Sequence, residues 1–304
     1  MAPGRIRGIT HILIPALISL AGCGSPAAGP GTAATVVPVP ITASPLSTTT
    51  SSVISTTTTV PAPTTTTTVG ELPEIDAEVR VPEGEGRFPA VVLVHGGAWV
   101  AGAPSGIRDL AVYLTGEGFL TVNTRYQLSD DSSPGFPGAL DDVACAVRYA
   151  AAHPQSDGTV AIVGHSAGAH LSAVVALTGD LYGEDCPIAG SGVPQRLVGI
   201  AGAYDVSRLG FIMIPFFGAG PNAAPDAWQA GNPQRLTDEN PDLSSLILIG
   251  ERDGLVDPSF ADDFNQALLD SGAQSLLEVV EGARHTDLVD PGVVGVLIVT
   301  WLER

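Results

Sequence analysis

Lysine is absent from this sequence of 304 residues, so all 13 basic side chains are arginine. Against them stand 32 acidic residues, and the formal net charge of −19 argues against nucleic acid or an anionic membrane surface as a partner. Cysteine is also scarce, with three residues, and neither a Cys-x-x-Cys pair nor a His-rich spacing occurs. We therefore expect no metal site, and a catalytic thiol has little support.

The amino-terminal residues have the pattern of a secretory signal: two arginines, an apolar run over residues 9–20, and small residues at its end. The run is too short, and too interrupted by Pro15, for a comfortable membrane span. Residues 20–23, Leu-Ala-Gly-Cys, resemble the lipobox of bacterial lipoproteins. The resemblance implies a signal peptide over 1–22, a lipid on Cys23, and a mature protein outside the bacterial membrane. An ordinary signal peptide with an incidental cysteine is the alternative.

Between residues 24 and 70 the chain carries no charged side chain and consists largely of Thr, Ser, Pro, Ala and Val. Such a stretch cannot bury enough surface to offset its conformational entropy, so we expect residues 23–70 to form a disordered Ser/Thr/Pro-rich linker. Linkers of this composition are often O-glycosylated. Residues 71–304 hold all the acids and 11 of the arginines, and their number suits one large domain.

Two cysteines, Cys145 and Cys186, remain in that domain. In an exported protein an even pair favours a disulfide over two free thiols, and we expect the two to be joined.

Apolar runs alternate with helical patterns along the domain, which predicts a mostly parallel sheet flanked by helices. The predicted strands are 77–81, 90–94, 119–123, 160–163, 197–201, 246–249 and 276–280, and the predicted helices are 107–116, 137–152, 169–177, 258–269 and 286–302. Residues 204–240 are rich in Gly, Pro and aromatics and predict an irregular segment that covers a site as a lid.

The strand–turn–helix pattern around residues 160–177 contains Gly-x-Ser-x-Gly at 164–168, with Ser166 at its centre. In this context the serine stands on a sharp turn above the sheet as a nucleophile. The amide of Ala167 opens the helix, where unpartnered N–H groups favour an anion. A chance Gly-Ser-Gly turn is the alternative.

A nucleophilic serine needs a histidine base and a carboxylate that orients it. Downstream of Ser166 the only histidines are His170, inside the same helix, and His285, after the last predicted strand. We expect His285 to be the base. Asp253 and Asp257 compete for the third role; Asp253 is favoured because it lies nearer the strand end, whereas Asp257 is placed to cap the next helix.

The predicted second strand ends in His-Gly-Gly-Ala-Trp at residues 95–99. Attack on a carbonyl creates an oxyanion, and Gly97, Ala98 and Ala167 are the predicted amide donors to it. We expect His95 to be a structural hydrogen bonder under this loop, and Trp99 to be a wall of the substrate pocket or simply packing.

Together these motifs resemble the α/β-hydrolase superfamily over residues 77–303, in the esterase branch with a His-Gly-Gly-x-Trp loop. The nearest groups are the BD-FAE-like carboxylesterases, beside kynurenine formamidases and hormone-sensitive-lipase-like esterases. The resemblance implies hydrolysis of carboxylic esters through an acyl-enzyme without a cofactor. Two departures limit it: Ala98 stands where the last group usually has glycine, and residues 125–129 read Arg-Tyr-Gln-Leu-Ser where that group has Tyr-Arg-Leu-Ala-Pro.

The sequence therefore predicts a lipid-anchored, extracytoplasmic serine esterase that acts on a small-molecule ester. An amidase, formamidase or peptidase with the same three residues is an alternative, and so is a binding protein that keeps only the fold. The acyl group, the alcohol and the oligomeric state are left open.

Overall fold

A seven-stranded sheet organises the part of the chain that the structure, a computed structural model, describes: residues 72–130 and 132–304. The strands are β1 (Ala77–Arg80), β2 (Phe88–Val94), β3 (Leu120–Thr124), β4 (Ser156–His165), β5 (Arg196–Ile200), β6 (Ser244–Gly250) and β7 (Gln274–Val280). Their order is β1-β3-β2-β4-β5-β6-β7, and β1 alone pairs antiparallel. The predicted mostly parallel sheet is thus confirmed. The predicted signal peptide, Cys23 and linker lie outside the described residues.

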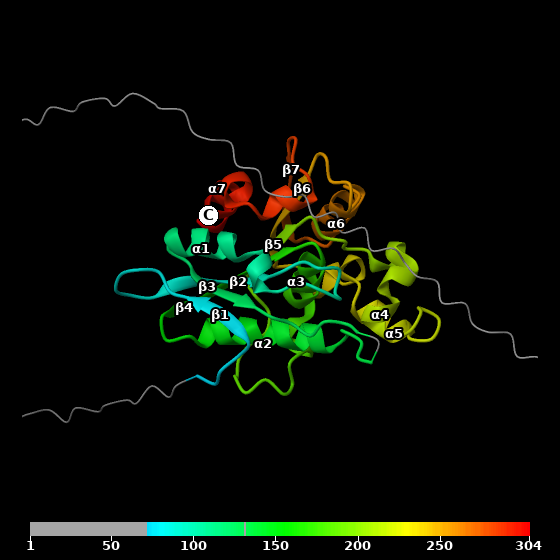
Figure 1. The fold of residues 1–304 in the computed structure, drawn as a ribbon, viewed down its shortest axis with the longest axis horizontal. Helices are drawn as coiled ribbons and strands as arrows, with labels where there is room; N and C mark the ends of the chain where they lie inside the picture. The colour runs from blue at the N-terminus through cyan, green and yellow to red at the C-terminus, as the bar shows by residue number, and fades with distance from the viewer. Residues whose placement is uncertain (1–71, 131) are drawn as a thin grey trace, which may run out of the picture. The chain divides into compact units, whose positions relative to one another are not determined.

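Helices cover both faces of this sheet (Figure 1). The α-helices are α1 (Arg108–Gly116), α2 (Gly138–Ala152), α3 (Ala167–Thr178), α4 (Ile214–Phe217), α5 (Pro225–Ala230), α6 (Ser259–Asp270) and α7 (Pro291–Leu302). Short 3-10 turns are η1 (Pro104–Gly106), η2 (Gly179–Leu181), η3 (Val206–Met213), η4 (Pro233–Arg235), η5 (Thr237–Glu239) and η6 (His285–Val289). α1 packs on α7, and α2 packs on α3. Within the described residues, none of the helices has the length and hydropathy that crossing a bilayer requires.

The core lies where β2 and β4 meet α3. Residues 90–94 of β2 are almost completely buried, and every residue of α3 is buried. This is why both segments read as continuous apolar runs: a central parallel strand and the helix behind it have no solvent face to mark with polar residues. The site at the end of β4 therefore rests on the buried core of the domain.

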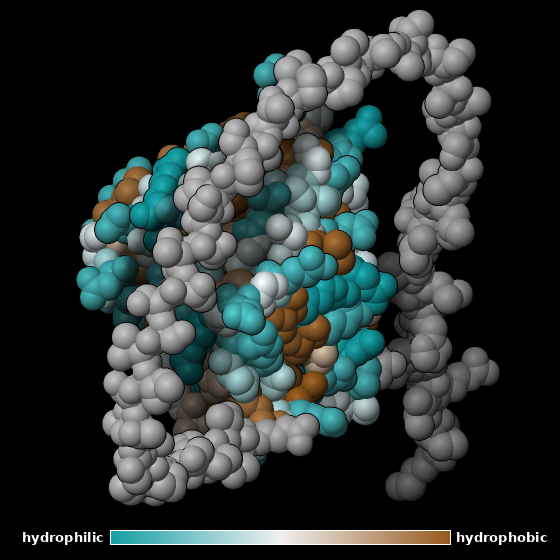
Figure 2. Space-filling model, turned by 90° about the vertical axis from the view of Figure 1, so that its left-hand side faces the viewer, coloured by the Kyte–Doolittle hydropathy of each residue, from teal (hydrophilic) through white to brown (hydrophobic). Residues whose placement is uncertain are grey.

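The surface is mainly hydrophilic on the side of the loop between β1 and β2. Figure 2 shows that side, where hydrophilic residues cover most of the face and surround a smaller hydrophobic area. The loop leads into the amino end of β2, so this face lies away from the carboxyl ends of the parallel strands.

Two predicted elements differ from the structure. The single helix expected over 286–302 is divided into η6 and α7, because Asp290 is extended and its carboxylate accepts a hydrogen bond from the Gly292 amide, with Pro291 as the first helical residue. A proline has no N–H to continue a preceding helix, and an N-cap followed by proline starts a new one. The segment 204–240, expected to be irregular, contains η3, α4, α5, η4 and η5.

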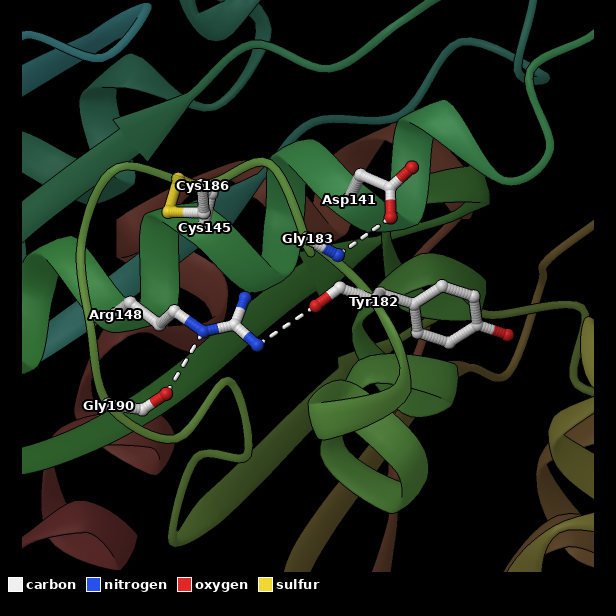
Figure 3. The surroundings of a disulfide bond; sticks show 7 residues. All are labelled: Asp141, Cys145, Arg148, Tyr182, Gly183, Cys186 and Gly190. Atoms are coloured by element: carbon white, nitrogen blue, oxygen red, sulfur yellow. Dashed lines mark hydrogen bonds between the residues drawn. A yellow bond between two sulfur atoms is a disulfide. The ribbon is translucent and has the colours of Figure 1, made fainter.

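Cys145 on α2 and Cys186 in the loop between η2 and β5 form a disulfide, as expected, with their Cα atoms 5.5 Å apart (Figure 3). The same loop is held by Arg148, whose guanidinium donates to the carbonyls of Tyr182 and Gly190, the latter at 3.0 Å. These contacts fix the loop on α2, and the Tyr182 hydroxyl then donates to the Ala230 carbonyl of the segment 204–240.

Candidate active site

Ser166 occupies a strained turn between β4 and α3. Its φ of 56° and ψ of −119° fall in a region that non-glycine residues rarely adopt. The turn is possible because its glycines have no side chains: a Cβ on Gly164 would lie 2.3 Å from the Gly168 carbonyl oxygen, and one on Gly168 would lie 2.1 Å from the Val94 oxygen. Strand and helix approach closely there, and Ser166 is presented at the carboxyl end of the sheet.

The 95–99 loop at the end of β2 lies directly against this turn. A Cβ on Gly96 would stand 3.1 Å from the Ser166 Cβ atom. Gly97, Ala98 and Trp99 all have positive φ, which turns the backbone tightly at this point. Among the described residues, the amides of Gly97 and Ala98 donate to no backbone carbonyl, and neither does the amide of Ala167 at the start of α3. Unpartnered amides next to a serine can bind an oxyanion.

His285 and Asp253 form the second part of the site. The Nδ1 atom of His285 donates to the Oδ2 atom of Asp253 at 2.8 Å, and the Asp253 side chain is completely buried. The other carboxylate oxygen accepts the amides of Leu255 and Val256, each at 2.9 Å. Asp257 instead accepts the amide of Ser259, the first residue of α6, from the position before the N-cap residue Pro258. The structure thus brings Asp253, and not Asp257, to His285.

The loops that carry these two residues are tied to each other. The Glu251 carboxylate accepts the Gly282 amide at 2.8 Å, and the Arg252 amide donates to the Ala283 carbonyl at 2.9 Å. Sequence reasoning did not single out Glu251, because nothing in the pattern indicates that this exposed acid reaches a backbone 31 residues away.

His165 connects His285 to the serine turn. Its ring lies 4.7 Å from the His285 ring, measured between centroids, and its Nε2 atom donates to the His285 carbonyl at 3.1 Å. Burial, and secondarily the neighbouring His285, lower the pKa of His165 to about 4, so the ring is neutral near pH 7. Since His165 directly precedes Ser166, this contact places His285 next to the serine turn. The Gly-x-Ser-x-Gly motif does not predict this contact, because it leaves the residue before the serine unspecified.

His170, the other histidine downstream of Ser166, is completely buried and joins two loops. Its Nδ1 atom accepts a hydrogen bond from the Trp99 indole at 3.0 Å, and its Nε2 atom donates to the Gly231 carbonyl at 2.8 Å. The bond from Trp99 requires the neutral ring, because a protonated Nδ1 atom could not accept it, and burial lowers the pKa of His170 to about 4. Trp99 is itself buried, and its ring centroid lies 6.1 Å from that of Phe216, so most of the indole packs against other residues of the domain.

His95 lies under its loop, as expected of a structural hydrogen bonder. Its ring stacks on Tyr126 with centroids 4.4 Å apart, and its Nδ1 atom donates to the Gly96 carbonyl at 2.8 Å. The Tyr126 hydroxyl donates in turn to the His95 carbonyl at 3.0 Å. Burial lowers the pKa of His95 below its usual value.

Comparison with solved structures identifies the fold. The chain is similar to a bifunctional GH43-CE from Bacteroides eggerthii, with a TM-score of 0.64 and 22% identity, covering 74% of this chain and 33% of that one. It is also similar to the esterase Est2 of Thermogutta terrifontis, with a TM-score of 0.60 and 20% identity, covering 75% and 88%. With these neighbours and its strand order, the domain has the α/β-hydrolase fold.

Two curated relatives match part of the chain. Esterase LipC of Mycobacterium tuberculosis is 32% identical over 125 residues, which are 38% of this chain and 30% of that protein. Kynurenine formamidase avaC of Aspergillus versicolor is 30% identical over 135 residues, 39% of this chain and 45% of that protein. The chain therefore spans less than half the length of the curated relatives it matches.

The family comparison covers most of the domain. The BD-FAE family model matches residues 78–268, which include the 95–99 loop, the serine turn and Asp253. Because this match extends over more than half of the chain, the protein belongs to the BD-FAE family.

Proposed function

We propose that this protein is a serine hydrolase that cleaves carboxylic esters through an acyl-enzyme. The observation that carries the proposal is the hydrogen bond between Asp253 and His285, with His285 packed on the residue that precedes the strained Ser166. A buried carboxylate on Nδ1 fixes the tautomer of a base, and a serine beside it supplies the nucleophile. The names of LipC and of Est2, both esterases, support ester cleavage.

In the proposed reaction, the Ser166 Oγ atom attacks the ester carbonyl while the Nε2 atom of His285 takes the hydroxyl proton. Asp253 keeps the Nδ1 proton in place and stabilises the imidazolium that forms. The amides of Gly97, Ala98 and Ala167 stabilise the oxyanion. His285 then gives its proton to the leaving alcohol, and the acyl group stays on Ser166. Water attacks this acyl-enzyme while His285 takes its proton, and His285 returns that proton to the Ser166 Oγ atom as the acid leaves. His285 relays every proton between Ser166, the leaving alcohol and the water, so the proposal includes no cofactor.

Amide hydrolysis is the second candidate, because one relative is named a kynurenine formamidase. The same six groups would act on an N-formyl amide, with an amine as the leaving group in place of an alcohol. Turnover of N-formylaniline separates the two candidates: an amide hydrolase cleaves it, whereas an esterase cleaves phenyl formate and leaves the anilide intact.

We also propose that the protein is a lipoprotein, anchored outside the bacterial membrane through a lipid on Cys23, with residues 1–22 removed as a signal peptide. The supporting observations are the signal pattern, the Leu-Ala-Gly-Cys sequence and the uncharged linker that would hold the domain away from the membrane. Cys23→Ala should abolish incorporation of a labelled fatty acid. Undiminished incorporation in the variant would contradict the anchor.

Ser166→Ala tests the proposed hydrolase directly. We expect a loss in kcat of the order of 10⁶-fold with p-nitrophenyl acetate, by analogy with the removal of a nucleophile from other triads. Alanine removes one oxygen atom, and the variant should fold as the native chain does. Turnover by this variant at the native rate would end the proposal.

A further inference from the structure

Five large apolar side chains are exposed on the segments around Ser166 and define what we call the apolar rim. Their exposed fractions are 51% for Val100, 79% for Phe211, 53% for Ile212, 39% for Ile214 and 76% for Leu255. Val100 follows the 95–99 loop, Leu255 follows Asp253, and the other three lie on η3 and α4. Exposed apolar surface collected around a site is typical of contact with an apolar ligand.

The segment that carries the three central rim residues runs between the two loops that flank the serine. At its beginning, Arg208 of η3 donates to the Ser259 hydroxyl at 2.7 Å and to Asp263 at 3.0 Å, both on α6 next to the Asp253 loop. At its end, Phe216 of α4 lies against Trp99 of the 95–99 loop. In Figure 1 this corner of the molecule, with α4 and α5, lies beyond α3 and opposite the β1–β2 loop.

The composition of the segment sets it apart from an ordinary surface turn. Residues 209–217 contain no polar or charged side chain. An amphipathic segment buries its apolar residues and exposes polar ones, but here both sides are apolar. Met213 and Phe216 are buried beneath it, while Phe211 and Ile212 are exposed just after Gly210, whose positive φ of 54° interrupts the helical turn. The outward face therefore has no role in the core of this domain.

We propose that the apolar rim binds a flexible apolar chain of the substrate while its ester group lies at Ser166. This inference rests on the proposed function and names its substrate class: an uncharged ester that carries an alkyl chain of about eight carbons on the acyl or the alcohol side. The surrounding charge favours an uncharged ester, since the domain has 32 acids and 11 arginines and would repel an anionic one.

The test measures kcat/KM of the full chain for p-nitrophenyl esters from acetate to octanoate and for alkyl acetates from ethyl to octyl, all below the concentration at which they aggregate. Complete burial of a methylene gives about a fourfold gain, and a chain lying on an open surface buries roughly half of it, so we expect about twofold per methylene. Between butyrate and octanoate this amounts to about 16-fold. A rise in either series supports the rim and identifies the side on which the chain lies.

Variants locate the effect on the rim. We divide kcat/KM for the longest ester of the series that rises by kcat/KM for its shortest ester. The double variant with Phe211→Ser and Ile212→Ser should lower this ratio about tenfold. The matched control is Val296→Ser on α7, which removes a comparably exposed apolar side chain (69%) outside the rim and should leave the ratio unchanged.

Three results would overturn the inference. They are a flat or falling chain-length series, a preference for acetylated xylan over every alkyl ester, and an unchanged ratio in the Phe211 and Ile212 variant. In each of them Ser166 would still be labelled by a fluorophosphonate and the proposed hydrolase would stand. If Ser166 is not labelled and no ester is cleaved, the proposed function fails and the rim inference fails with it.

Discussion

Asp253→Asn gives the sharpest single-atom perturbation of the proposed site. The carboxylate accepts three hydrogen bonds, from His285 at 2.8 Å and from the amides of Leu255 and Val256 at 2.9 Å each. An asparagine keeps the two amide bonds through its oxygen, and this turns its NH₂ group toward the His285 Nδ1 atom. Nδ1 must then accept, so the ring proton moves to Nε2. A histidine in that tautomer cannot take the proton of Ser166.

The expected loss in kcat is about 10⁴-fold, equivalent to about 5 kcal/mol of activation free energy. The matched control is Asp257→Asn, in the same loop, where the carboxylate accepts the Ser259 amide of α6 while His285 bonds to Asp253. We expect its kcat to change less than about twofold. Initial rates with p-nitrophenyl acetate measure both, and circular dichroism verifies the folds. The reasoning is refuted if Asp253→Asn keeps more than about a tenth of the native kcat, or if Asp257→Asn loses activity to the same degree.

Two further predictions concern stability. His165 and His170 have native pKa values of about 4, against an ordinary value of 6.5, so the unfolded chain binds more protons than the native one as the pH falls through 6.5. Each ring should therefore lower the free energy of unfolding by about 2 kcal/mol at pH 5 and by nothing above pH 7, as measured by urea denaturation. An unfolding free energy equal at pH 5 and pH 7 would contradict their burial as neutral rings. The Cys145–Cys186 disulfide closes a loop with a sequence separation of 41, and replacing both cysteines with alanine should lower the free energy of unfolding by about 4 kcal/mol. If the urea concentration at the midpoint of unfolding does not change, the bond does not constrain the unfolded chain.

The sequence was sufficient where chemistry and periodicity are local. β2 and α3 read as apolar runs because they are buried, and Gly-x-Ser-x-Gly is a short motif whose glycines are needed for steric reasons at the turn itself. Asp253 was preferred over Asp257 from its distance along the chain alone, and the structure places it against His285.

The contacts that the sequence did not predict join residues far apart in the chain. His165 reaches the His285 carbonyl across 120 residues, and His170 reaches Trp99 across 71. No periodicity records which of several buried rings meet, because that depends on how β4, α3 and the last loop pack. The division between η6 and α7 was missed for a local reason: the apolar pattern continues across Asp290 and Pro291, although the backbone does not.

A crystal structure of the protein after reaction with a fluorophosphonate tests the central claim most directly. The account predicts phosphorus bonded to the Ser166 Oγ atom, with its unesterified oxygen about 3 Å from the amides of Ala167 and of Gly97 or Ala98, and the Nε2 atom of His285 within hydrogen-bonding distance of Oγ. An unmodified Ser166, or an adduct whose oxygen points away from these amides, would contradict it.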